Sequence, residues 1–266
     1  TSQAISELSN LVERRPDLTS AQFLLASAYR AAAKLEPALR IYQSLSRNSP
    51  TNPQPAFLIG LVQRQMDRNA DARRSFEHVL TFAPGFLAAV EQLVGLDLAE
   101  KHSAAALLRA QAQVDQTPTN PAPYVLLAGV QLVETNLPAA EATLLKALAF
   151  APEYGPANAL LARIYVTANK HPAALKTLNE MVARNTNDLA SWLKIAELHS
   201  AASNYPAAKQ TYEKALAVNP RYVPVLNNLA WLAAVRLGDL KLAYELGSKA
   251  HDLRPADPFT SDTFGW

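Results

Sequence analysis

The side chains that could carry out chemistry are few and scattered. The chain has no cysteine, which excludes disulfides, thiol catalysis and cysteine-based metal sites. No pair of its five histidines has metal-ligand spacing, and no H-E-x-x-H motif occurs. The eight glycines form no phosphate-binding loop, and there is no G-x-S-x-G motif. We therefore predict that the protein is not an enzyme and binds neither a metal ion nor a cofactor.

Composition narrows the class of protein further. Hydrophobic residues make up 49% of the 266 residues and charged residues 18%, which predicts a folded chain with a large core. The formal net charge of +2 is too small for a general nucleic-acid or anionic-membrane binder, so we predict no nucleic-acid partner. No apolar run approaches the length of a membrane span.

Prolines recur at a constant spacing along the chain. Pro16, Pro50, Pro84, Pro118, Pro152 and Pro220 are separated by 34 residues or a multiple of 34. The series lacks a proline at Thr186, and a further proline, Pro255, comes one residue late. Proline ends helices because it lacks an N–H group and clashes with the preceding turn. The spacing therefore indicates a repeated unit that closes with the end of a helix.

Each unit contains two amphipathic patterns separated by a short break. In 189–222, Trp192, Ile195 and Ala196 share one helical face, and Ala208 and Tyr212 share another after the break at 203–205. We count positions from the third residue after each proline step. Position eight is then usually small: Ala26, Gly60, Val94, Ala128, Ala162, Ala196 and Ala230. Position twenty is always alanine in the first six units: Ala38, Ala72, Ala106, Ala140, Ala174 and Ala208.

Over its whole length, the chain resembles the tetratricopeptide repeat (TPR) family. The resemblance rests on the 34-residue period, the small residues at positions eight and twenty and the proline at position thirty-two. The resemblance implies an all-α, right-handed α-solenoid of stacked helix–turn–helix units. We predict seven complete repeats, at 19–52, 53–86, 87–120, 121–154, 155–188, 189–222 and 223–257. Residues 1–18 match the second helix of a truncated repeat, and residues 258–266 match the start of another.

The chain begins and ends within a repeat, so we expect a segment of a longer array. No signal peptide is found, and any targeting sequence would lie outside the segment. Two repeats depart from the pattern. The third, 87–120, is degenerate at Val94, Asp97 and Ala110, and the seventh carries one extra residue near Gly238. We expect looser packing or altered curvature at both.

The resemblance also implies a concave groove lined by positions two, five, nine, twelve and thirteen of the first helices. Carried onto this sequence, it gives the candidate groove residues Phe23, Arg30, Phe57, Arg64, Leu98, Val125, Leu132, Val133, Arg163, Leu193, Glu197 and Asn227. Packing between neighbouring first helices is an equal alternative for Val125, Leu132 and Val133. Trp231, at position nine, is expected to pack rather than to contact a ligand.

Solenoids act by presenting surface, so we predict a protein–protein interaction scaffold that binds a peptide or partner segment in the groove. One alternative is a structural spacer within a longer array. Another is a guide that contacts polysaccharide, although Phe23 and Phe57 make a short aromatic row for that role. The oligomeric state stays open.

The C-terminal stretch carries a narrower resemblance. Asn228-Leu229-Ala230-Trp231, Ala243-Tyr244-Glu245 and Asp262-Thr263-Phe264-Gly265-Trp266 are similar to segments of bacterial TPR proteins of exopolysaccharide export and exosortase-linked systems. This implies a periplasmic or outer-membrane-associated scaffold of a cell-envelope assembly, with a cytoplasmic location as the alternative.

The repeat register itself can be tested. Ala208→Leu should destabilise the fold by about 1–3 kcal/mol, because position twenty has room only for a methyl group between helices. Urea unfolding followed by circular dichroism measures the change. An unchanged free energy of unfolding would mean that the register is wrong.

Overall fold

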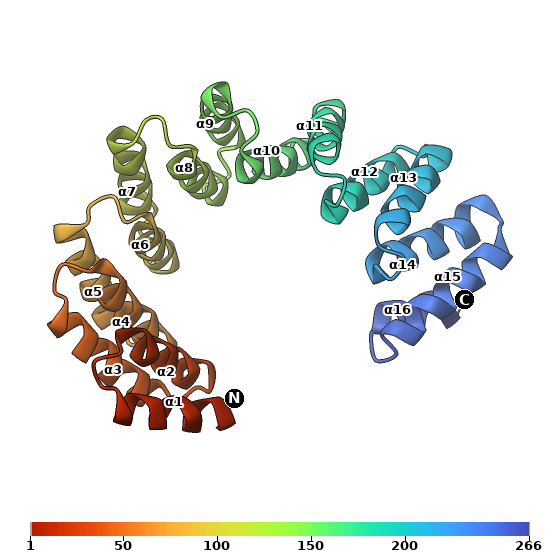
Figure 1. Cartoon of the computed structure of the whole chain (residues 1–266). Helices are drawn as coiled ribbons and strands as arrows, with labels where there is room; N and C mark the ends of the chain where they lie inside the picture. The colour runs from red at the N-terminus through yellow and green to blue at the C-terminus, as the bar shows by residue number, and fades with distance from the viewer. Residues whose placement is uncertain (1, 266) are drawn as a thin grey trace. The chain divides into compact units, whose positions relative to one another are not determined.

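The computed structural model describes residues 2–265, without the side chain of Phe264. The described chain is helical almost throughout and contains no strand (Figure 1). Thr1 and Trp266, which belong to the predicted partial repeats, lie outside the described residues. The prediction of an all-α fold made of stacked helix pairs is confirmed. None of the helices within residues 2–265 combines the length and hydropathy of a membrane span.

First and second helices alternate along the chain. The first helices are α2 (Thr19–Ala31), α4 (Pro53–Gln65), α6 (Leu87–Ala99), α8 (Pro121–Val133), α10 (Gly155–Thr167), α12 (Leu189–Ala201) and α14 (Val223–Leu232). The second helices are α3 (Leu35–Asn48), α5 (Asn69–Phe82), α7 (Ser103–Gln116), α9 (Leu137–Phe150), α11 (His171–Arg184), α13 (Tyr205–Val218) and α15 (Leu240–Leu253). Helix α1 (Ser2–Arg14) precedes this series, and α16 (Pro258–Gly265) follows it. Each first helix begins at the residue that the repeat register assigns to position one.

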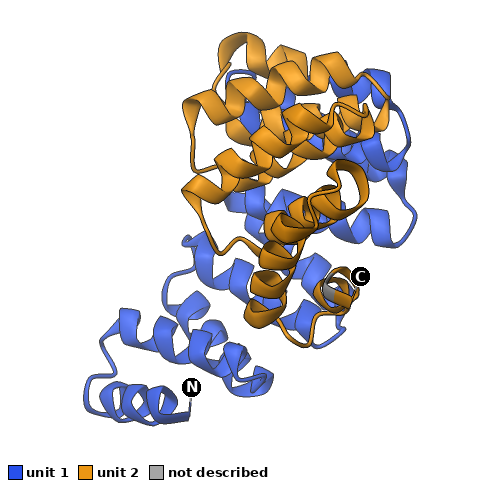
Figure 2. Cartoon of the chain, turned by 90° about the vertical axis from the view of Figure 1, so that its right-hand side faces the viewer, with its two compact units in different colours: residues 1–143 blue, residues 144–266 orange. Residues whose placement is uncertain are grey.

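The chain divides into two compact units, Thr1–Thr143 and Leu144–Trp266, and the division falls within α9 (Figure 2). Within each unit, helices that are adjacent in sequence pack together, and the first helices form one layer and the second helices the other (Figure 1). Direct contacts join first helices of successive repeats, as between α6 and α8 and between α12 and α14.

The two helices of a repeat meet where position eight packs on position twenty-four. A Cβ atom added to Gly60 would lie 2.7 Å from Cδ1 of Phe76, a contact that real Cβ atoms do not make. Phe76 is fully buried, as is Tyr42 at the equivalent position opposite Ala26. Packing at this density leaves room at position eight only for a small residue whenever position twenty-four is large.

The third repeat reverses these two sizes. Val94 occupies position eight and Ala110 position twenty-four, and both are buried, with 3% and 0% of their surface exposed. The larger residue on the first helix therefore replaces volume that the second helix lacks. This part of the sequence departure is a compensated exchange, and the expected loosening is not found here.

In repeats one to six, a residue with left-handed backbone conformation lies two places after the end of the first helix. These residues are all at position fifteen and have φ between 55° and 61°: Ala33, Asp67, Lys101, Thr135, Asn169 and Ser203. In the first repeat, the amide of Lys34 donates to the carbonyl of Tyr29, and that of Ala33 donates to Arg30, which closes the helix end. The chain is thereby reversed into the second helix after the same number of residues each time.

The seventh repeat accommodates its extra residue in a π-helical turn. Helix α14 continues into η1 (Ala233–Leu237), and the left-handed residue moves one place later, to Gly238 with φ of 68°. A π-turn is the usual way to insert one residue into a helix without breaking it. Helix α15 then begins one residue late, at Leu240, after Asp239 caps its N-terminus by accepting from the amide of Leu242.

A recurring hydrogen bond fixes the loop between repeats. The side chain at position four donates to the main-chain carbonyl six residues earlier, as Tyr124 does to Pro118 at 2.9 Å. Asn158 binds Pro152 in the same way. Trp192 donates to Thr186 at 2.9 Å, so the loop is held even where the proline series is interrupted.

The fit between Gly60 and Phe76 predicts opposite effects of one substitution at two glycines. Gly60→Ala should destabilise the protein by about 1–3 kcal/mol, because the new methyl group overlaps the Phe76 ring. Gly129→Ala, in the interior of α8 with no heavy atom near its Cβ direction, should stabilise it by about 0.5–1 kcal/mol through helix propensity. Urea unfolding measures both. Equal effects at the two sites would contradict the proposed close crossing.

Candidate functional site

The predicted groove residues of the first unit lie on α2, α4, α6 and α8, and several already have partners. The Phe23 ring lies 6.3 Å from that of Tyr42, and the Phe57 ring lies 5.7 Å from Phe76 and 5.2 Å from Phe86. Both phenylalanines are half-buried. They therefore extend the core of their repeats toward the groove, and only part of each ring is left for a ligand.

The two arginines predicted beside these rings are also half-buried. Arg64 Nη1 donates to Oε1 of Gln92 at 2.6 Å, which links α4 to α6. A Cβ atom added to Gly95 would lie 3.9 Å from Nη1 of Arg64, which is an ordinary van der Waals distance. Arg64 therefore joins neighbouring repeats. Arg30 lies at the corresponding position of α2.

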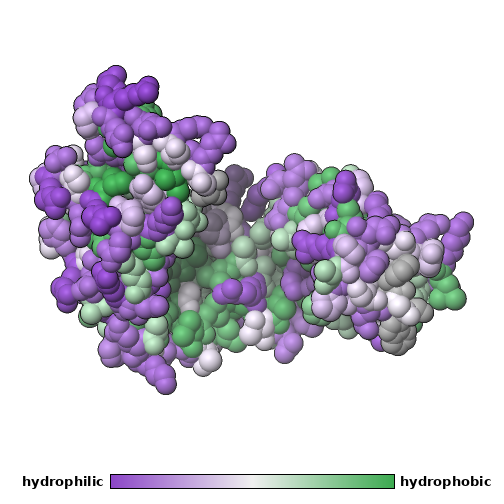
Figure 3. Space-filling model, turned by 90° about the horizontal axis from the view of Figure 1, so that it is seen from below, coloured by the Kyte–Doolittle hydropathy of each residue, from purple (hydrophilic) through white to green (hydrophobic). Residues whose placement is uncertain are grey.

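The apolar candidates of α6 and α8 differ in exposure. Leu98, Val125 and Leu132 are half-buried, whereas Val133 at the end of α8 is 60% exposed. Apolar side chains gather in patches on the face that Figure 3 shows, among polar ones that cover most of that face. Of these four residues, Val133 offers the most free apolar surface to a partner.

In the second unit, six of the described first-helix residues line a pocket of about 440 Å³ together with Tyr212 of α13 and Thr263 of α16. We call it the α12–α14 pocket. Its lining residues are Glu197, Ser200, Ala201, Tyr212, Asn227, Asn228, Trp231 and Thr263. Glu197 and Asn227 were predicted from their positions nine and five, and the structure brings them to the same cavity.

The α12–α14 pocket is polar and partly unsatisfied. Oδ1 of Asn227 is buried and has no hydrogen-bond partner. Burial raises the pKa of Tyr212 to about 12, opposed by its hydrogen bond with Asn228 and reinforced by the charge of Glu197. The phenol is therefore neutral at physiological pH. Glu197 accepts from Lys194 Nζ at 2.6 Å on the open face of α12.

Trp231 lies at the edge of this pocket and is 44% exposed. The guanidinium of Arg236 lies over its ring, 5.6 Å from the centroid, and equally over the ring of Tyr205. The expectation that Trp231 mainly packs is therefore only partly met. Much of the indole stays open to solvent beside the cavity.

A second pocket of about 380 Å³ lies between α10, α11 and α12. We call it the α10–α12 pocket. Its walls are mainly apolar, with Val166, Leu178 and Met181 among them. The predicted groove residue Arg163 and Lys194 add positive charge, and Asp188 adds a negative charge. Leu193, in contrast, is half-buried against the core cluster around Tyr212, so its role is mainly packing.

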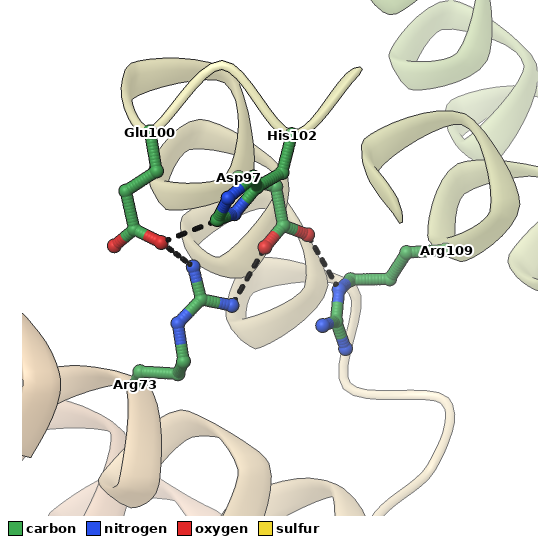
Figure 4. A network of polar contacts seen from close by, with 5 residues as sticks. All are labelled: Arg73, Asp97, Glu100, His102 and Arg109. Atoms are coloured by element: carbon green, nitrogen blue, oxygen red, sulfur yellow. Dashed lines mark hydrogen bonds and ion pairs between the residues drawn. The ribbon is translucent and has the colours of Figure 1, made fainter. Parts of the chain in front are cut away.

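Asp97, singled out as a departure in the third repeat, forms a buried ionic network in the first unit (Figure 4). Its side chain is 2% exposed, and it accepts from Arg73 Nη1 at 2.6 Å and from Arg109 Nε at 3.1 Å. Arg73 also binds Glu100 at 2.9 Å, and His102 lies 3.4 Å from the same carboxylate. The hydrogen bond to Asp97 raises the pKa of the Arg73 guanidinium. One carboxylate thus ties α5, α6 and α7 together.

Comparison with known families agrees with this architecture. Three family models described as tetratricopeptide repeats match residues 20–52, 134–198 and 193–258, which together make up more than half of the chain. The chain belongs to the tetratricopeptide repeat family. TPR proteins are generally scaffolds for protein interaction, and none of the matching models describes an enzyme. No curated protein matches the sequence.

Solved structures show the same TPR fold at low sequence identity. Yeast Tom70 is 17% identical with a TM-score of 0.71, over 99% of this chain and 57% of Tom70. The C-terminal part of a TPR protein from Cytophaga hutchinsonii is 16% identical with a TM-score of 0.65, over 91% of this chain and 98% of the other. A chain of the APC/C hetero-tetramer Cut9–Hcn1 is 15% identical with a TM-score of 0.58, over 98% of this chain and 51% of the other. This chain therefore spans little more than half of Tom70 and of the Cut9–Hcn1 chain.

The repeat register did not predict every residue of the α12–α14 pocket. Tyr212 and Asn228 are at positions twenty-four and six, where packing is the usual role, and Thr263 comes from the partial repeat. Asn228 and Thr263 were noted only as parts of the C-terminal resemblance. One feature of the sequence could have indicated the pocket. The amide pair Asn227-Asn228 begins at groove position five of the seventh repeat, and Glu197 is at groove position nine of the sixth.

The Asp97 network predicts unequal costs for two aspartates. Asp97→Ala should destabilise the protein by about 3 kcal/mol, because Arg73 and Arg109 lose their shared counter-ion in a mostly buried site. Asp71→Ala removes only the exposed pair with Arg74 on α5 and should cost less than about 1 kcal/mol. Urea unfolding monitored by circular dichroism compares them. Similar small losses would show that Asp97 contributes no linkage between the repeats.

Proposed function

We propose that the chain is a scaffold that binds a segment of a partner protein on its first-helix face. The observation that carries this proposal is the position of the two pockets of the second unit. Most of their lining residues come from α10, α12 and α14, and they include the predicted groove residues Arg163, Glu197 and Asn227.

The chemistry of the two pockets suits a peptide better than a small apolar molecule. The α10–α12 pocket has apolar walls that can take an aliphatic or aromatic side chain. The α12–α14 pocket offers a carboxylate, amides and hydroxyls that can bind polar groups of a peptide. Apolar and polar recognition side by side is typical of grooves that bind a segment through a few anchor residues.

The first unit supplies a further apolar contact. Val133 is 60% exposed at the end of α8, and the half-buried Leu132 precedes it. An exposed apolar side chain on a first helix can add to peptide binding by losing contact with water. We include this part of the first-helix face in the proposed binding surface, with Leu98 and Val125 as its half-buried floor.

The Cut9–Hcn1 structure supports the general role, because there a chain of the same fold belongs to a hetero-tetramer. This similarity names no partner for the present chain. If no partner segment binds the first-helix face, a spacer within a longer array becomes the better description.

We also propose that this scaffold serves a bacterial cell-envelope assembly, with exopolysaccharide export as the process and the periplasm or the outer membrane as the location. The support is the resemblance of the stretch that includes Asn228–Trp231 and Ala243–Glu245 to proteins of such systems. Immunoblotting of periplasmic, membrane and cytosolic fractions of the native cell tests it. Recovery with the cytosol would contradict it.

Matched substitutions on opposite faces test the binding surface. Peptides selected from a random display library on the wild-type chain should bind Ala159→Trp about ten-fold more weakly, because the indole fills the α10–α12 pocket. Ala183→Trp, on the exposed side of the second helix α11 in the same repeat, should leave affinity unchanged.

A second pair of variants tests the first unit. Peptides that bind there should bind Val133→Glu more weakly, whereas the control Leu108→Glu on α7, where the leucine is 74% exposed, should leave their affinity unchanged. Fluorescence anisotropy measures each affinity.

Two outcomes would contradict the proposed function. One is a loss of affinity as large for the second-helix controls as for the first-helix variants. The other is failure to select any peptide whose binding depends on Ala159 or Val133. Unchanged melting temperatures of all four variants ensure that the comparison reports binding.

A further inference from the structure

We propose that the α12–α14 pocket binds a basic side chain, arginine or lysine, of the partner segment. This inference rests on the proposed function and specifies the ligand chemistry of one of its pockets. It follows from the hydrogen-bonding groups, the charge and the aromatic ring that line the cavity.

One wall residue of the pocket, Asn227, has a buried acceptor that lacks a donor. Oδ1 of Asn227 is buried and unpartnered, although nearly all buried polar atoms in folded proteins are hydrogen-bonded. Its neighbour Asn228 is engaged with the buried hydroxyl of Tyr212. The group that completes the site must therefore donate hydrogen bonds. Arginine and lysine side chains are the richest donors in a peptide and cannot accept.

The charge of the pocket has the matching sign. Among the described lining residues, Glu197 is the one that carries a charge at neutral pH, since the phenol of Tyr212 stays protonated. Its present partner, Lys194, is three residues away on the same helix, and both side chains are substantially exposed. Exposed pairs of this kind contribute little and exchange readily. A partner's guanidinium or ammonium group can therefore replace Lys194 at the carboxylate.

The tryptophan ring at the edge also favours a cation. Trp231 already carries the guanidinium of Arg236 over its ring at 5.6 Å, which shows that a cation can lie at the ring. Trp is the aromatic side chain with the strongest attraction for cations. A basic side chain entering the pocket would find the indole and the carboxylate of Glu197 around it, with Asn227 in the wall.

The neighbouring pocket adds a requirement to the sequence of the partner. One pocket is lined by α10 and α12 and the other by α12 and α14, so the two cavities both adjoin α12, and the paired Lys194 and Glu197 line one pocket each. A segment with a basic residue in the polar pocket can place an apolar residue in the other. We therefore expect selected peptides to combine one basic and one apolar residue at a fixed spacing.

A double-mutant cycle tests the basic anchor. A selected arginine peptide and its citrulline analogue, which has the same shape without the charge, are titrated into the wild type and Glu197→Gln, and affinity is read by fluorescence anisotropy. Glu197→Gln should weaken the arginine peptide by about ten-fold and the citrulline peptide by less than about two-fold. Glu213→Gln, an exposed carboxylate on the second helix α13, is the control and should change neither affinity.

A second variant separates ligand binding from a purely structural role. Asn227→Leu removes an acceptor that has no partner in the free protein, so the melting temperature should stay the same or rise. Binding of the arginine peptide should nevertheless weaken. If the melting temperature falls and binding is unchanged, Asn227 is structural and the inference is overturned.

The outcomes distinguish this inference from the proposed function. If peptides depend on Ala159 but show no preference for a basic residue and no response to Glu197→Gln, the basic anchor is wrong while binding to the first-helix face stands. A neutral oligosaccharide such as cellohexaose is the competing ligand. If it binds, the peptides do not, and Trp231→Ala abolishes its binding, then the pocket binds carbohydrate and the inference is overturned. If no peptide depends on the first-helix face, the proposed function fails as well.

Discussion

Close contact between the two helices of a repeat is the constraint on which the rest of the structure depends. A small residue at position eight lies against a larger one at position twenty-four, as Gly60 lies against the buried ring of Phe76. With the left-handed residue at position fifteen, this contact fixes how each helix pair folds back on itself. The first helices then form one layer of each unit, and their outer faces are left for other functions. The pockets of the second unit are a consequence of that arrangement.

The sequence could predict the repeat register because proline and alanine act there through local geometry. Pro50 and Pro84 end second helices, and Ala38 and Ala208 have no exposed surface because two helices meet at them. Their identities follow from sterics alone, so their spacing reveals the fold. The resemblance to TPR proteins, applied to this register, implied groove positions for Glu197 and Asn227, and both line the same pocket.

What the sequence could not predict depends on pairs of residues from different repeats. Asp97 looks like a defect until Arg73 and Arg109, from two other helices, are found around it. Arg64 sits at a groove position, yet it donates to Gln92 of the next repeat. Both cases turn on which neighbour a side chain reaches, which one repeat does not specify. The α12–α14 pocket likewise needs Thr263 from the following partial repeat.

The central claim is that partners bind the first-helix face and leave the exposed side of the second helices free. Methyl chemical-shift mapping by NMR with a selected peptide tests it most directly. Perturbed methyl groups should be those of Ala159, Val166 and Ala201 on α10 and α12, while Leu175 on α11 and Val218 on α13 stay unchanged. Perturbations concentrated on α11, α13 and α15, with the first helices unaffected, would contradict the account.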